Sequence, residues 1–169
     1  IAIVNKIDKN KNAKRQIKVK DSLKFLTESS KIFRQNINTK IIAITGSCGK
    51  TTLKELLGIT LKKISKVSFS PKSYNNKYGV PLSLFNLDPK DDYGVLEVGM
   101  DKKGEIDYLS KIVQPDVSVI TNINYAHAKN FNSLKEIALA KSEIINNTKE
   151  NGFVILNADD NFFNLHKKI

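Results

Sequence analysis

Short apolar segments alternate with longer amphipathic segments from residue 40 onward. The apolar segments resemble buried strands, and they lie at 41–45, 67–69, 94–98, 117–121 and 153–156. Three intervening segments repeat apolar residues at helical spacing, at about 50–63, 104–112 and 133–145. Apolar strands joined by helices usually pair in parallel, with helices on both faces of the sheet. The pattern therefore predicts an α/β fold with a mostly parallel sheet flanked by helices.

The first 39 residues have a different pattern. Two short apolar segments at 1–4 and 16–19 predict strands, and a loop rich in lysine and asparagine separates them. Asp21 is placed to begin a helix, and a polar stretch follows that helix. Because the composition changes abruptly near residue 40, we expect a domain border there. Residues 1–39 would form the tail of a small α/β domain, and 40–169 would belong to a second domain.

Two of the expected helices have distinct apolar stripes. The stripe of the helix at about 50–63 consists of Leu53, Leu56, Leu57, Leu61 and Ile64. The helix at 133–145 begins at Ser133, and Glu136 completes a capping-box pattern three residues later. Its stripe consists of Leu134, Ile137, Ala138 and Ile145.

Lys141 lies in the middle of this second stripe. A lysine there can extend its amine to the rim of the apolar surface. Alternatively, desolvation lowers its pKa and leaves a neutral, nucleophilic amine. Lys135 lies on the opposite face and is expected only to face solvent. Lys141 is therefore a candidate functional residue, with the rim position as the alternative.

Residues 45–52 read TGSCGKTT, between an expected strand and an expected helix. This context is typical of a P-loop, where backbone N–H groups and a helix N-terminus bind phosphate. We expect Lys50 to contact the β and γ phosphates and the Thr51 hydroxyl to contact Mg²⁺. Ile44 stands where the Walker A pattern has its first glycine, so a glycine-rich turn without a ligand is the alternative. The candidate nucleotide-binding residues are Gly46, Ser47, Cys48, Gly49, Lys50, Thr51 and Thr52.

Composition restricts the classes of protein that fit. The chain has 169 residues, 40% of them hydrophobic and 27% charged, which is ordinary for a folded protein. One cysteine excludes an intramolecular disulfide framework, and no apolar run is long enough to span a membrane. The formal charge of +11 raises nucleic-acid binding as a possibility. However, the lysines are spread along the chain without interleaved aromatic residues, so we expect no nucleic-acid partner.

Six motifs occur in one order along the chain. They are TGSCGKTT, YNNKYGVPLSL at 74–84, VLEVGM at 95–100, GEIDYL at 104–109, ITNINYAHAKNFNSLKEIALAKSEI at 120–144 and LNADD at 156–160. Together they resemble the Mur ligases of peptidoglycan synthesis, strongly over about 40–169. Residues 1–39 resemble the tail of that family's uridine-nucleotide-binding domain.

The resemblance implies formation of an amide bond through an acyl phosphate, with ATP and Mg²⁺. The pattern is most similar to the family member that adds D-alanyl-D-alanine to a UDP-N-acetylmuramoyl-tripeptide. Another Mur ligase, or a ligase similar to folylpolyglutamate synthase, is the alternative within the same class. A basic P-loop protein that binds nucleic acid is the alternative of a different class.

The resemblance also implies roles for single residues. Glu97 matches a glutamate that binds magnesium, and His127 matches a histidine of a second magnesium site. Lys141 matches a lysine that CO₂ carbamylates, and a carbamate is an anionic oxygen ligand suited to Mg²⁺. Asn75 and Asn76 match a loop that faces the substrate and the phosphates. We therefore expect catalytic roles for Lys50, Lys141 and His127, and metal ligation by Thr51, Glu97, His127 and Lys141.

Some positions depart from the family pattern. Lys72 and Ser73 replace a Gly-Asn pair, and 101–103 replace an Asn-His-Pro stretch. His166 matches no motif and is expected at the surface. The family has three domains, and we expect the central one to be cut short here and the last one to be absent. The chain alone is then expected to be inactive, and the protein to be monomeric and cytoplasmic.

Overall fold

The strands form two parallel sheets within residues 1–125 and 130–169, which the computed structural model describes. The smaller sheet consists of β1 (Ala2–Val4) and β2 (Gln16–Lys18). The larger sheet consists of β3 (Lys40–Thr45), β4 (Val67–Phe69), β5 (Tyr93–Glu97), β6 (Val117–Ile120) and β7 (Phe153–Leu156). Its strand order is β4-β5-β3-β6-β7, and every pairing is parallel, which confirms the predicted α/β fold.

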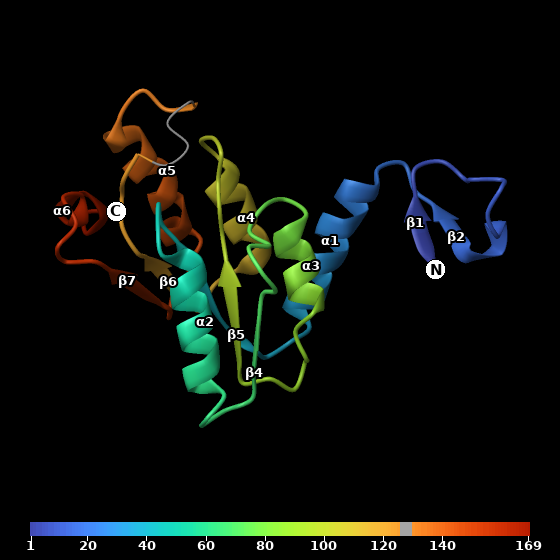
Figure 1. The fold of residues 1–169 in the computed structure, drawn as a ribbon, viewed down its shortest axis with the longest axis horizontal. Coiled ribbons are helices and arrows are strands. Elements are labelled where there is room, and N and C mark those ends of the chain that lie inside the picture. The colour runs from blue at the N-terminus through green and yellow to red at the C-terminus, as the bar shows by residue number, and fades with distance from the viewer. Residues whose placement is uncertain (126–129) are drawn as a thin grey trace.

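Helices cover both faces of the five-stranded sheet (Figure 1). They are α1 (Ser22–Gln35), α2 (Lys50–Leu61), α3 (Gly79–Phe85), α4 (Glu105–Val113), α5 (Leu134–Asn146) and α6 (Phe163–His166), with a 3-10 turn η1 at Ala13–Arg15. α2 packs on one face, and α3, α4 and α5 pack on the other. Within the described residues, no helix has both the length and the apolar character needed to cross a membrane.

The five-stranded sheet separates two apolar clusters. In the larger cluster, Ile106 of α4 and Ile137 of α5 are fully buried against the sheet. In the smaller cluster, Ile44 and Val95 of neighbouring strands pack against Leu53 of α2. Because the strands are parallel, their carboxyl ends meet at one edge of the sheet, where ligands of open α/β folds usually bind.

The apolar stripe predicted for α2 is partly wrong. Leu56 is 60% exposed and Ile64 is 80% exposed, whereas Lys54 and Gly58 are buried. The helix lies so close to β4 that a Cβ atom added to Gly58 would sit 2.4 Å from the Phe69 ring. The side of α2 that faces β4 therefore needs a glycine, and large apolar side chains remain on its outer side.

The expected helix caps are present, with one difference. The Asp21 carboxylate caps α1 by accepting hydrogen bonds from the N–H groups of Leu23 and Lys24. Ser133 caps α5 by accepting the Glu136 N–H at 3.2 Å. The Glu136 carboxylate accepts the N–H of Asn132, one residue before the position that the capping box predicts.

α1 packs against α3 and α4, while β1 and β2 lie beyond its outer end, away from the larger sheet (Figure 1). Arg34, near the end of α1, is buried and its Nε donates to the Val113 carbonyl at 2.7 Å. Its Nη2 lies 2.8 Å from the Asp116 carboxylate. The Thr27 hydroxyl lies 2.9 Å from the Tyr108 hydroxyl of α4. These contacts attach α1 firmly to the helical layer beside the candidate site.

Candidate functional site

The glycine-rich loop between β3 and α2 has a backbone that only glycine adopts readily. Gly46 has φ 145° and Gly49 has φ 80°, both in the region that side chains disfavour. A Cβ atom on Gly46 would lie 1.9 Å from the Thr121 hydroxyl oxygen. The loop can therefore turn tightly from the strand into the helix, and the N-terminal turn of α2, with Thr52 exposed, begins directly after it.

The segment that follows β6 holds this loop. Asn122 accepts the Cys48 N–H through Oδ1 at 3.0 Å and donates from Nδ2 to the Cys48 carbonyl at 3.2 Å. The Thr121 hydroxyl donates to the same carbonyl at 2.7 Å, and the Ser47 hydroxyl donates to the Asn124 carbonyl at 2.9 Å. Sequence reasoning missed this role of Asn122, although its place after a neighbouring parallel strand is a usable signal. The Cys48 thiol is exposed.

Lys50 lies across the loop that precedes it. Its amine donates to the Gly46 carbonyl at 2.8 Å and approaches the Ser47 carbonyl at 3.4 Å. The amine, the loop N–H groups and the helix N-terminus form one positive region that suits a phosphate group. The arrangement fits the predicted nucleotide-binding residues.

Glu97 ends β5 and is only 1% exposed. One carboxylate oxygen accepts the Thr51 hydroxyl at 2.8 Å, and the other accepts the Asn75 amide at 2.7 Å. These bonds stabilise a carboxylate that would be costly to bury alone. Gly99 makes room for Asn75, because a Cβ there would lie 2.9 Å from the Asn75 Oδ1. Three predicted site residues therefore meet at the carboxyl edge of the sheet.

The oxygen atoms of Thr51 and Glu97 could hold Mg²⁺ beside a phosphate. This ion commonly takes one or two protein oxygens and completes its shell with water and phosphate. Among residues 1–125 and 130–169, no group of three or more His, Cys, Asp or Glu side chains forms a ready metal site. The two oxygen donors of Thr51 and Glu97 fit an ion that shares its shell with phosphate and water.

Lys141 projects from α5 and is 2% exposed. Burial, and after it the positive charge of Lys50, lower the pKa of Lys141 to about 7, while Cys48 opposes the shift. Within the described part of the chain, the Lys141 amine makes no hydrogen bond or ion pair. A large share of these amines is therefore neutral at neutral pH, which permits nucleophilic chemistry.

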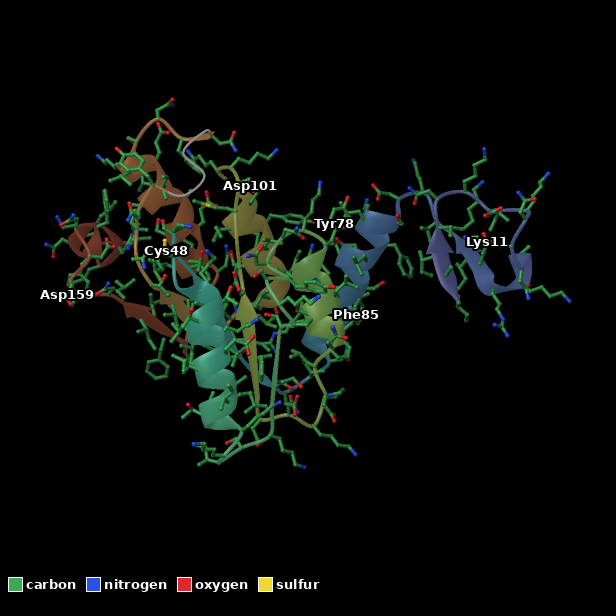
Figure 2. All side chains as sticks on the ribbon, in the orientation of Figure 1. Lys11, Cys48, Tyr78, Phe85, Asp101 and Asp159 are labelled. Atoms are coloured by element: carbon green, nitrogen blue, oxygen red, sulfur yellow. The ribbon has the colours of Figure 1, made fainter. Side chains whose placement is uncertain are left out.

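A cavity of about 310 Å³ joins these groups. Lys141 lines it together with Lys50, Asn75, Asn76, Tyr78 and Asp101. Figure 2 shows Tyr78 and Asp101 at the same upper end of the molecule. The Asn76 Oδ1 also accepts the N–H groups of Tyr78 and Gly79, so this residue shapes the start of α3 as well.

The predictions for the two histidines are not confirmed by the structure. His127 lies outside the residues that the structure describes, so its predicted metal role stays a prediction. The prediction that His166 is at the surface is wrong, because this side chain is 4% exposed. Its Nε2 lies 3.1 Å from the Ala138 carbonyl, and burial lowers its pKa. α6 packs on α5 through this residue, a contact that the short apolar pattern before it does not reveal.

Comparison with known proteins agrees with this geometry. A profile of the Mur ligase middle domain matches residues 44–169. A UDP-N-acetylmuramoyl-tripeptide–D-alanyl-D-alanine ligase of Buchnera aphidicola is 44% identical over 135 residues, covering 80% of this chain and 30% of that protein. The chain thus spans about a third of the length of the curated relatives that it matches.

Solved structures give the same result. A crystal structure of MurF from Acinetobacter baumannii has a TM-score of 0.90 and 38% identity, covering 99% of this chain and 37% of that one. MurF from Thermotoga maritima, solved in complex with ADP, has a TM-score of 0.81 and 34% identity, covering 93% of this chain and 36% of that one. The chain therefore belongs to the Mur ligase middle domain family.

Proposed function

We propose that the protein containing this chain is an ATP-dependent ligase that joins D-alanyl-D-alanine to a UDP-N-acetylmuramoyl-tripeptide. The observation that carries the proposal is that Lys50, Lys141 and Asn75 line one cavity. The Asn75 amide holds the Glu97 carboxylate, which also accepts the Thr51 hydroxyl. The names of the relatives support the substrates, and the ADP complex of the Thermotoga protein supports the nucleotide. The border between a uridine-nucleotide domain at 1–39 and the ATP-binding domain at 40–169 belongs to the same proposal.

The proposed reaction has two steps, phosphoryl transfer and amide formation. The terminal carboxylate of the tripeptide attacks the γ-phosphorus of ATP, which forms an acyl phosphate and releases ADP. The amine of D-alanyl-D-alanine then attacks the acyl carbon, and inorganic phosphate and a proton leave. Because charge develops on phosphoryl oxygens, catalysis depends on positioning and on cations near those oxygens. Lys50 and the N-terminal turn of α2 supply fixed positive charge for the first step.

Thr51 and Glu97 would hold Mg²⁺ on the nucleotide, and His127 would belong to a second ion. When bound, Mg²⁺ neutralises phosphate charge and orients the γ-phosphoryl group. Asn75 has a second use in this arrangement, since its amide holds the Glu97 carboxylate at 2.7 Å. Outer partners of this kind orient metal ligands and influence metal affinity.

Lys141 would act as a carbamate. Its neutral amine attacks the carbon of CO₂, a C–N bond forms, one C=O bond opens to an oxyanion, and the amine proton passes to water. The product carries a negative charge where an ammonium would repel both Lys50 and Mg²⁺. The burial of Lys141 and its pKa of about 7 support this assignment, because both favour the neutral amine that the reaction requires.

An assay of phosphate release by the full-length protein tests the function. We expect release to require UDP-N-acetylmuramoyl-tripeptide, ATP, Mg²⁺ and D-alanyl-D-alanine together. Release with a single amino acid, and none with D-alanyl-D-alanine, would assign the protein to another Mur ligase or to a folylpolyglutamate synthase-like activity. Release by residues 1–169 alone would contradict our expectation that this chain is inactive by itself.

The charge of +11 makes a nucleic-acid control necessary. Binding of a basic protein to DNA or RNA falls steeply as salt rises. We expect negligible affinity for either nucleic acid at physiological salt. Tight binding there, without ligase activity, would favour the nucleic-acid alternative over the ligase.

A further inference from the structure

Lys54 has no part in the chemistry described above, although it lies on the functional side of α2. It is three residues after Thr51 and four before Gly58, so the three residues share one helix face. Its side chain is 0% exposed, which is unusual for a lysine unless its charge is paired. The close packing of Gly58 on Phe69 brings this face of α2 against β4 and the segment that follows it.

The partners of Lys54 lie in the segment that leads to Asn75. Its amine donates to the Ser70 carbonyl at 2.8 Å and to the Lys72 carbonyl. It also lies 3.0 Å from the Glu55 carboxylate, but the Glu55 side chain is 43% exposed. Exposed ion pairs contribute little, whereas hydrogen bonds between a buried charge and carbonyl oxygens contribute much more. The carbonyls at 70 and 72 are therefore its important partners.

The segment has a backbone that needs such support. Lys72 has φ 48°, in the left-handed region that non-glycine residues rarely adopt. Its carbonyl points to Lys54, and three residues later the Asn75 carbonyl accepts the Gly99 N–H at 2.7 Å. The Asn75 side chain then reaches Glu97. The segment is thus held at one end by Lys54 and at the other by β5 and the residues after it.

We propose that Lys54 is a positioning residue for the loop 70–78, which places Asn75 and Asn76 in the cavity. It links the helix that carries Lys50 and Thr51 to the loop expected to face the UDP-linked substrate, and it touches neither ligand. The inference rests on the proposed function, because that function assigns the loop to the substrate and the phosphates. Its consequence is an effect on both sides of the site, because Asn76 lines the cavity and Asn75 also holds the Glu97 carboxylate.

The kinetic test compares Lys54→Met with Glu55→Gln in the full-length protein. For Lys54→Met we expect the KM for the UDP-linked tripeptide to rise about tenfold, the order of the loss when an outer partner of a metal ligand is removed. The KM for ATP should rise as well, because Asn75 holds Glu97. Loss of folded enzyme alone would lower kcat and leave both KM values unchanged. Glu55→Gln should match the wild type. A wild-type KM for the tripeptide in Lys54→Met would contradict the proposal.

Amide hydrogen exchange tests the same proposal without catalysis. In Lys54→Met, the N–H groups of Gly99 and Val80, which donate to carbonyls of the loop, should exchange faster, while the N–H of Leu53 in α2 keeps its rate. Unchanged exchange at Gly99 and Val80 would overturn the proposal even if the protein proved to be a different ligase. If Lys54→Met does not fold, Lys54→Gln, which keeps two N–H donors, should show the same changes at smaller size, and wild-type exchange rates in it would overturn the proposal.

Discussion

Two lysines are almost completely buried, Lys54 in α2 and Lys141 in α5, and their surroundings differ. Lys54 of α2 has two carbonyl oxygens and a carboxylate within reach of its amine. Lys141 of α5 has no hydrogen-bond partner within the described part of the chain, and the charge of Lys50 lies near it. The first amine is a structural link between a helix and a loop. The second has no such partner among residues 1–125 and 130–169, which suits an amine that binds a ligand or reacts.

The comparison shows that burial alone does not identify a functional lysine. A buried charge with well-placed oxygen partners stabilises one conformation, whereas a buried charge without partners shifts its pKa instead. Replacing each lysine by methionine, which keeps the volume and removes the charge, should therefore have opposite effects on stability and different effects on activity.

The largest expected effect is loss of activity in Lys141→Met. We expect ligase turnover to fall at least about 100-fold, the order seen when one preorganised electrostatic group is removed from an active site. Steady-state phosphate release by the full-length protein measures it. Lys135→Met, on the exposed face of the same helix, is the matched control and should keep wild-type turnover. Full activity in Lys141→Met would favour the alternative, in which this lysine only extends its amine to the rim of the apolar surface.

The second expected effect is on the stability of Lys54→Met. Two buried carbonyls lose a charged donor, so the free energy of unfolding should fall by about 2 kcal/mol. Urea denaturation of the full-length variant measures this change, with Glu55→Gln as the control. A variant as stable as the wild type would show that the contacts of Lys54 are replaceable.

The third expected effect has the opposite sign. In CO₂-free buffer without nucleotide, Lys141→Met should be more stable than the wild type by at least about 1 kcal/mol at pH 7. Each unit of pKa shift corresponds to about 1.4 kcal/mol, and burial lowers the pKa of Lys141 from 10.5 to about 7. The pKa of Lys141 is about 7 when folded and higher when unfolded, so the unfolded state binds more protons between these values. Wild-type stability should therefore rise toward pH 10 relative to the variant. A constant difference across this range would contradict the lowered pKa.

The smallest expected effect concerns the carboxylate of Asp116, which pairs with Arg34, another buried cation. Burial alone raises the pKa of Asp116, but hydrogen bonds from Lys149 and the Ile41 N–H, with the charges of Arg34 and Lys149, leave it below its ordinary value. Its contribution to stability is therefore present above the unfolded pKa of about 3.9 and is lost as pH falls through the lower folded value. Asp116→Asn should lack this acid-dependent loss in thermal unfolding. The same acid dependence in the variant would assign it to other carboxylates.

Sequence reasoning predicts local geometry well where the information lies in neighbouring residues. The glycine-rich loop is contiguous, and the structure shows the turn that Gly46 and Gly49 permit, with Lys50 lying across it. The family resemblance indicates Glu97, and its position at the end of an apolar strand agrees with its burial in the structure. Lys141 was conspicuous because it interrupts a regular stripe. In each of these cases the periodicity or the motif itself contains the signal.

The missed features depend on contacts between distant segments. The partners of Lys54 lie 16 and 18 residues later, and their relevance requires knowing which face of α2 meets β4. For the same reason, the predicted apolar stripe of α2 includes Leu56, which the structure shows to be exposed. Asn122 holds a loop 74 residues earlier in the chain. His166 is buried by a short helix whose packing on α5 leaves no periodic signal.

The most direct test of the central claim is ¹³C NMR of the full-length protein equilibrated with ¹³C-bicarbonate. The account predicts a protein-bound carbamate signal in the wild type that is present in Lys135→Met and absent in Lys141→Met. A wild-type protein without a carbamate signal, or a signal that persists in Lys141→Met, would contradict the assignment of Lys141 as the reactive lysine of the pair.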